Sequence, residues 1–157
     1  MAERVPITPG GYEKLKRELE HLKNVERPEV IKQIQYARSL GDLSENAEYE
    51  TAKNKQSMVE GRIQDLEAKI SLAEIIDPAQ IKNRDKVVFG LTVTVEDAET
   101  GDETRYQLVG PDETDPDNGL ISVTSPIGRA LVGKQVDDEV RVTTPGGVRD
   151  LIVAGID

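Results

Sequence analysis

The most constraining feature of this sequence is a long helical seam of apolar residues in its first half. From Tyr49 onward such residues recur at alternating steps of three and four, with one polar exception, in the order Tyr49, Ala52, Gln56, Val59, Ile63, Leu66, Ile70 and Ala73. This heptad spacing keeps one face of an α-helix against a partner helix. The segment therefore predicts a long helix in a coiled coil.

A second seam with the same spacing precedes the first. It comprises Tyr12, Leu15, Leu19 and Leu22, and it resumes one residue late at Val30, Ile34 and Ala37. Pro28 lies in the gap, so the sequence predicts a break or a kink there. Thr8 followed by Pro9 predicts the start of the helix, with the threonine hydroxyl as N-cap. Two seams joined by a short polar loop favour an antiparallel coiled-coil hairpin.

Glycine and proline mark where the helical half ends. Only one proline and two glycines lie between Tyr12 and Asp77, whereas the chain from Pro78 onward holds five prolines and nine glycines. We expect strands over 87–96, 104–110, 119–125, 139–144 and 148–156, and a short helix over 125–133. The sequence thus predicts an α+β chain with two domains. Residues 1–77 form the hairpin, and residues 78–157 form a small antiparallel sheet packed on the short helix.

Composition excludes several classes of protein. The chain has no cysteine and one histidine, so it lacks the residues for a disulfide framework, a thiolate zinc site or a cysteine nucleophile. A net charge of −10 argues against broad binding to duplex nucleic acid. No apolar run approaches the length of a membrane span, and the N-terminus lacks the apolar stretch of a secretory signal. We therefore expect a soluble, cytoplasmic protein without membrane partners.

Four carboxylates gather at the turn of the hairpin, residues 41–50: Asp42, Glu45, Glu48 and Glu50. One interpretation is structural: Gly41 ends the first helix in a left-handed conformation, and Asp42 or Ser44 caps the second. The other is that a long arm delivers the carboxylates to a partner. Oxygen ligands suit Mg²⁺, but one exposed tip offers no pocket wall. Carboxylates that do chemistry here would complete another protein's active site.

Basic residues stand beside this tip on both arms. Arg38 lies on the first arm, and Lys53 and Lys55 lie on the second. They form either an ordinary solvated face of a coiled coil or a small basic patch that guides a nucleic-acid strand past the tip.

Three separated motifs resemble the GreA/GreB family of bacterial transcript cleavage factors. They are GDLSENAEYE at 41–50, EGRIQDLEAKI at 60–70 and LISVTSPIGRALVGK at 120–134. The resemblance covers essentially the whole chain. It implies an N-terminal coiled-coil hairpin, a C-terminal FKBP-like domain, and action on RNA polymerase rather than on a free substrate.

The resemblance also implies roles for residues at the tip. The family's essential acidic pair falls on Asp42 and Glu45, which are donated to the polymerase active site, and its supporting asparagine falls on Asn46. Contacts to the RNA 3′ end fall on Arg38 and Lys53. The family often has arginine at position 53, whose planar guanidinium can make two parallel hydrogen bonds to a phosphate. Lys53 would instead contact phosphate as a point charge.

The polymerase-docking loop of the family falls on Thr124, Ser125 and Pro126. Gly128 stands where the family usually has alanine. Because glycine is the poorer helix former, it is expected to loosen the short helix by roughly 0.5–1 kcal/mol.

The mechanism implied by the resemblance begins when a polymerase backtracks and extrudes the RNA 3′ end. The hairpin enters the secondary channel, Asp42 helps to hold a Mg²⁺ shared with the polymerase, and Glu45 positions or deprotonates the attacking water. The protein would then act as a monomer, with no cofactor of its own and no independent enzymatic activity.

Three alternatives remain open on the sequence. An inhibitory paralogue could enter the channel and block it, although the intact Asp42 and Glu45 pair argues against this. A peptidyl-prolyl isomerase needs an aromatic pocket, and only Phe89 and Tyr106 follow Pro78. In a purely structural coiled-coil adaptor, the charges of the tip would be only solvating.

Overall fold

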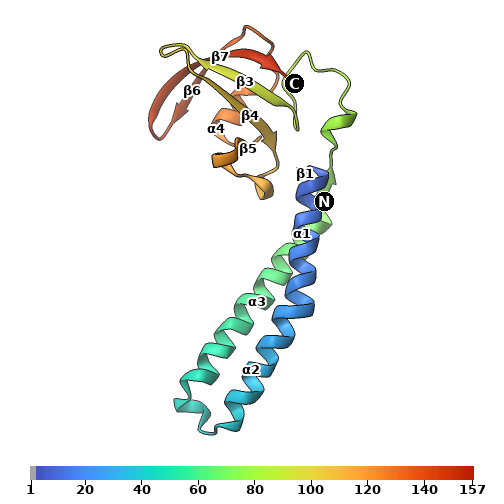
Figure 1. Ribbon diagram of the computed structural model, residues 1–157, viewed down its shortest axis with the longest axis vertical. Helices are drawn as coiled ribbons and strands as arrows, with labels where there is room; N and C mark the ends of the chain where they lie inside the picture. The colour runs from blue at the N-terminus through green and yellow to red at the C-terminus, as the bar shows by residue number, and fades with distance from the viewer. Residues whose placement is uncertain (1–2) are drawn as a thin grey trace. The chain divides into compact units, whose positions relative to one another are not determined.

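The computed structural model describes residues 3–157, which divide into two compact units (Figure 1). One unit is the helical hairpin over 12–72, and the other combines residues 3–11 with residues 73–157. The expected boundary after Asp77 lies in the connection that follows the hairpin. Within residues 3–157, no helix is long and apolar enough to cross a membrane.

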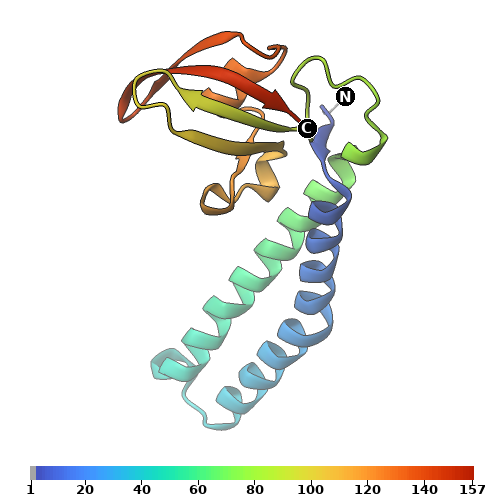
Figure 2. The same ribbon diagram turned by 45° about the horizontal axis from the view of Figure 1, so that its top comes forward.

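The hairpin has two antiparallel arms (Figures 1 and 2). The first arm runs through α1 (Pro9–His21), the π-helical segment η1 (Leu22–Glu26) and α2 (Arg27–Ser39), and the second is α3 (Ala47–Leu72). The Thr8 hydroxyl caps α1 by accepting a 3.2 Å hydrogen bond from the Gly11 N–H, as expected. The predicted seam is confirmed, because its remaining members are half-buried and these are buried: Leu15, Val30, Ile34, Ala37, Ala52, Val59, Ile63 and Leu66.

The first arm continues through Pro28 as a helix instead of breaking. A proline inside an α-helix removes one hydrogen bond, and its ring collides with the carbonyl four residues earlier. The π-helical turn of η1 lies immediately before this position and holds one more residue per hydrogen-bonded turn than an α-helix. The extra residue accounts for the one-residue slip of the seam between Leu22 and Val30.

The second unit contains a five-stranded sheet in the order β5-β4-β3-β7-β6. Its strands are β3 (Thr92–Asp97), β4 (Glu103–Val109), β5 (Leu120–Ser122), β6 (Glu139–Thr144) and β7 (Gly147–Ile156). The short helix α4 (Pro126–Leu131) contributes Leu131 to the buried core, beside valines and leucines of the sheet. The sheet is mostly antiparallel, which confirms the predicted fold class.

Two details of the sheet differ from expectation. The strand predicted from residue 87 begins only at Thr92, because Gly90, at φ +89°, is in a turn closed by a hydrogen bond from the Leu91 N–H to the Val88 carbonyl. The pair β4 and β5 is parallel. Parallel neighbours need a crossover connection, and residues 110–119 provide it through the proline-initiated 3₁₀ turns η4 (Pro111–Glu113) and η5 (Pro116–Asn118).

A small parallel pair in this unit escaped sequence analysis. Strand β1 (Val5–Ile7) pairs with β2 (Ala73–Ile75). Three-residue strands are too short for a period-two pattern to stand out.

Candidate functional site

The tip of the hairpin reverses through two consecutive left-handed residues. Gly41 has φ +80°, as expected for the residue that ends α2, and Asp42 follows with φ +47° and ψ +65°. The 3₁₀ turn η2 (Leu43–Glu45) comes next, and the Glu45 N–H donates to the Asp42 carbonyl at 3.2 Å. Because a 3₁₀ turn has three residues, one turn separates the two carboxylates of the expected acidic pair.

The structure does not use Asp42 or Ser44 as the cap of the second arm, so that expectation is wrong. The cap is Asn46, whose Oδ1 accepts a 3.0 Å hydrogen bond from the Tyr49 N–H. The side chain of Asp42 accepts one hydrogen bond, from the Ser44 hydroxyl at 3.2 Å. The cap explanation of Asp42 therefore fails, and its carboxylate is exposed at the tip.

Asn46 also ties the two arms together. Its Nδ2 donates to the Ala37 carbonyl at 2.7 Å and to the Gly41 carbonyl at 3.3 Å. Both acceptors lie at or beyond the last turn of α2, and the Ala37 carbonyl also accepts from the Leu40 N–H at 3.2 Å. One half-buried amide thus joins the end of one arm to the start of the other, which fixes the turn that carries Asp42 and Glu45.

The two expected basic residues lie along one edge of the hairpin. The Arg38 guanidinium carbon lies 5.9 Å from the centre of the Tyr49 ring, within the range of a cation–π interaction. Lys53, four residues after Tyr49, shares its helix face, and its ammonium donates to the Gln56 side chain at 3.1 Å. We assigned Tyr49 only to the seam, so its second role beneath Arg38 was missed. The sequence carries no local signal for it, because Arg38 and Tyr49 lie on different arms and meet only when the hairpin folds.

The tip has the oxygen chemistry of a magnesium ligand but not a complete site. Asp42 and Glu45 are both exposed, and Asp42 Oδ2 has no hydrogen-bond partner among the described residues. No group of three or more His, Cys, Asp or Glu side chains in residues 3–157 is arranged to hold a metal ion. Carboxylate oxygens of this kind fit Mg²⁺, which is often held by one or two carboxylates with other ligands.

The expected docking loop lies between β5 and α4, and its three residues differ in character. Ser125 caps α4, because its hydroxyl accepts from the Gly128 N–H at 3.0 Å and donates to the Ser122 carbonyl at 2.7 Å. The Thr124 and Ser122 hydroxyls are hydrogen bonded at 2.7 Å. Thr124 and Pro126 are exposed, whereas Ser125 is half-buried. Ser125 therefore shapes the loop, while Thr124 and Pro126 present its surface.

Gly128 has a packing role that the sequence did not reveal. A Cβ atom at this position would collide with the Ser122 carbonyl oxygen. The short helix can therefore approach β5 closely because residue 128 has no side chain. The expected loss of helix propensity is thus only part of the effect of Gly128.

The loop borders an apolar groove of about 400 Å³. Its walls include Pro116, Ile121, Pro126, Ile127 and Pro145, and none of the residues that line it is aromatic. This groove lacks the aromatic lining that a peptidyl-prolyl isomerase pocket requires.

Comparison with known proteins gives matches over both units. A model described as "Transcription elongation factor, N-terminal", for GreA and GreB, matches residues 5–75, and the model for the GreA/GreB C-terminal domain matches residues 82–157. A transcription elongation factor GreA of Verminephrobacter eiseniae is 54% identical over 152 residues, covering 97% of this chain and 96% of the relative. Another, from Syntrophobacter fumaroxidans, is 56% identical over 153 residues, covering 98% and 97%. A solved structure of GreA factor homolog 1 from Thermus thermophilus is 31% identical, covers 99% of both chains and has a TM-score of 0.46.

Proposed function

Because the chain belongs to the GreA/GreB family of transcription elongation factors, we propose that it rescues backtracked RNA polymerase. The hairpin enters the secondary channel and stimulates the polymerase's own Mg²⁺-dependent cleavage of the extruded RNA. The observation that carries this proposal is the exposed acidic pair at the tip, where Asp42 is held in a left-handed conformation and caps no helix.

Each carboxylate of the pair has its own task in this proposal. Asp42 provides an oxygen ligand for a Mg²⁺ ion shared with the polymerase, and Glu45 orients the attacking water and accepts its proton. Mg²⁺ bound there supplies positive charge that stabilises the phosphate in the transition state. The one-turn spacing keeps the two carboxylates together while they perform different work.

The neighbouring residues hold the tip and the RNA. Asn46 fixes the turn through its three hydrogen bonds. Arg38, supported by the Tyr49 ring, and Lys53 form a basic edge that contacts the RNA near its 3′ end. Phosphate attraction to two cations positions a strand without reading its sequence.

The second unit docks the factor on the polymerase in this proposal. Thr124 and Pro126 contact the rim of the secondary channel, and the Ser125 cap holds them in place. The factor acts as a monomer in the cytoplasm, where the polymerase works, and it has no nuclease activity of its own.

The intact acidic pair favours cleavage over simple blocking of the channel. A coiled-coil adaptor whose tip charges are only solvating does not require a carboxylate in a left-handed conformation. Charge reversal at Asp42 separates the adaptor from the cleavage factor, because an adaptor would keep its activity.

The test uses a stalled, backtracked polymerase complex with labelled RNA. The factor should accelerate cleavage of the RNA by this complex and should leave free RNA intact in Mg²⁺ buffer. Robust cleavage of RNA by the factor alone would contradict the division of labour, and no acceleration with the polymerase would contradict the function.

A further inference from the structure

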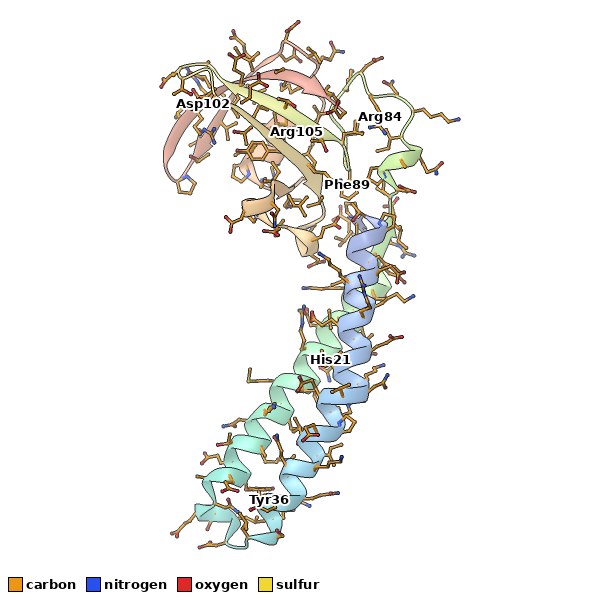
Figure 3. All side chains as sticks on the ribbon, in the orientation of Figure 1. His21, Tyr36, Arg84, Phe89, Asp102 and Arg105 are labelled. Atoms are coloured by element: carbon orange, nitrogen blue, oxygen red, sulfur yellow. The ribbon has the colours of Figure 1, made fainter. Side chains whose placement is uncertain are left out.

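The hairpin near its tip has two different edges. Tyr36 and Arg38 flank the buried Ala37, and neighbouring residues of an α-helix point about 100° apart, so these two side chains leave α2 on opposite sides of the seam. Arg38 belongs to the basic edge with Tyr49 and Lys53. The Tyr36 edge has no part in the function proposed above. Figure 3 labels Tyr36 close to the turn of the hairpin.

A cleft of about 540 Å³ opens along the Tyr36 edge. Both arms line it, with Glu29, Lys32 and Tyr36 from α2 and Ala47, Glu48 and Thr51 from α3. The cleft is hollow because the side chains of Ala47 and Thr51 are small. Tyr36 is 62% exposed, and an exposed aromatic side chain beside a hollow is a common anchor in protein interfaces.

The charges of the cleft favour a cation. Glu29 and Glu48 contribute two carboxylates against the single ammonium of Lys32, and none of the three has an ion-pair or hydrogen-bond partner within residues 3–157. The acidic tip adds further negative charge nearby. An RNA phosphate would be repelled here, whereas an arginine or lysine side chain would gain both carboxylate contacts and the face of an aromatic ring.

We infer that this cleft binds a basic side chain from the protein wall of the polymerase channel. The inference rests on the proposed function. When the basic edge of the hairpin faces RNA inside the channel, the opposite edge faces the protein wall. The guanidinium or ammonium group lies over the Tyr36 ring, in the cleft whose lining carries the carboxylates of Glu29 and Glu48. This contact sets how deeply the hairpin enters the channel and how it is rotated there, and it takes no part in the cleavage reaction.

The first test measures the factor concentration that gives half of the maximal cleavage rate. Replacing Tyr36 with alanine should raise this concentration about 3- to 10-fold while the maximal rate stays unchanged, because a cation–π contact is lost. Tyr36→Phe keeps an aromatic face and should change little. Met58→Ala is the matched control, because Met58 is a 75% exposed side chain of α3 outside the cleft. A Tyr36→Ala variant that behaves like wild type would overturn the inference.

The second test identifies the partner. A photoreactive benzoylphenylalanine at position 36 should crosslink to a polymerase subunit, and crosslinks to RNA instead would overturn the assignment to protein. Glu29→Lys should raise the half-saturating concentration and Lys32→Glu should lower it, and the opposite order would refute the charge argument. Failure of the wild-type factor to stimulate cleavage contradicts the proposed function itself, whereas normal stimulation with no Tyr36 effect contradicts only the cleft.

Discussion

The distinguishing feature of Asp42 is its left-handed backbone conformation, because its side chain does not cap a helix. Left-handed dihedral angles are rare for residues other than glycine, and aspartate and asparagine tolerate them best. Such a conformation costs roughly 1 kcal/mol or more. Glycine would remove this cost, so the aspartate at this position supports the role proposed for its carboxylate.

Asp42→Asn should separate charge from shape. Asparagine also tolerates the left-handed region, so the free energy of unfolding should change by less than about 1 kcal/mol. Cleavage by the polymerase complex should fall by about 10²-fold or more, because a positioned metal ligand is lost. Raising the Mg²⁺ concentration should restore part of the rate. The measurement is the cleavage rate over a Mg²⁺ titration, with thermal unfolding as the control for stability.

Glu45→Gln provides the comparison for this experiment. Its rate should fall by about 10²- to 10⁴-fold, as for the loss of a general base, and should respond much less to Mg²⁺. Equal rescue of both variants would show that the two carboxylates do not have separate roles. Near wild-type cleavage by Asp42→Asn would remove that residue from the mechanism.

Asn46 should be the structural centre of the tip. Asn46→Ala removes the cap and both ties to α2 and should destabilise the protein by about 1–2 kcal/mol. Asn46→Asp keeps an oxygen that can cap α3 but loses the two donated hydrogen bonds. The unfolding temperature of Asn46→Asp should therefore lie between those of wild type and Asn46→Ala. Equal unfolding temperatures of the two variants would contradict the double role of Asn46 as cap and as tie between the arms.

Ion pairs between the helices join the arms away from the tip. Arg27 of α2 donates to both Glu60 oxygens at 2.7 and 2.9 Å, and Arg62 of α3 donates to both Glu18 oxygens of α1 at 2.8 Å. In each pair the hydrogen bond from the arginine lowers the pKa of the glutamate below its ordinary value. The arms are thus held by a buried seam with charged clamps along its borders.

These clamps should weaken in acid. A carboxylate whose pKa is lower in the folded state stabilises the fold above its unfolded pKa of about 4.3, and this contribution is lost as the pH falls through the folded pKa. Glu18→Gln should therefore lower the unfolding temperature at pH 7. Between about pH 5 and pH 3, the unfolding temperature of this variant should fall less than that of wild type. The effect should stay below about 1 kcal/mol, because the pair is solvated.

The control is Glu20→Gln, which changes an exposed glutamate of α1 without an ion pair among the described residues. Circular dichroism at several pH values provides the measurement. An identical acid response of both variants would show that the Glu18 clamp contributes nothing to stability.

The sequence predicted the elements that depend on repeated patterns. The seam of α3, the Thr8 cap and the period-two runs of the sheet are each set by local spacing, and the structure confirms them. Features set by contacts distant in sequence were missed. The parallel pairing of β4 and β5 depends on the path of the crossover, and the need for glycine at position 128 depends on the Ser122 carbonyl.

The candidate site shows the same limit. Its residues came from resemblance, whereas the choice of Asn46 over Asp42 as cap depends on which donor meets which acceptor in a turn of six residues. Several of these polar residues can cap a helix, so composition alone could not choose between them.

The two tasks proposed for the molecule lie in different units of the chain. The residues assigned to chemistry belong to the hairpin over 12–72, and the residues assigned to docking belong to the unit that includes 73–157. Chemistry and binding should therefore be separable by single substitutions. Pro126 is the better target in the docking loop, because it is exposed, whereas replacing Ser125 would also remove a helix cap.

A factor that docks but cannot cleave should inhibit one that can. Asp42→Asn, mixed in excess with wild type, should occupy the same polymerase complexes and reduce cleavage in proportion to its share of the total factor, because the two proteins bind equally. Adding Pro126→Ala to the same chain should relieve this inhibition, since the double variant docks more weakly while its free energy of unfolding falls by less than about 1 kcal/mol. Cleavage rates at fixed wild-type concentration, with increasing amounts of each variant, give the measurement. Equal inhibition by both variants would show that the loop after β5 makes no docking contact and that the hairpin alone holds the polymerase.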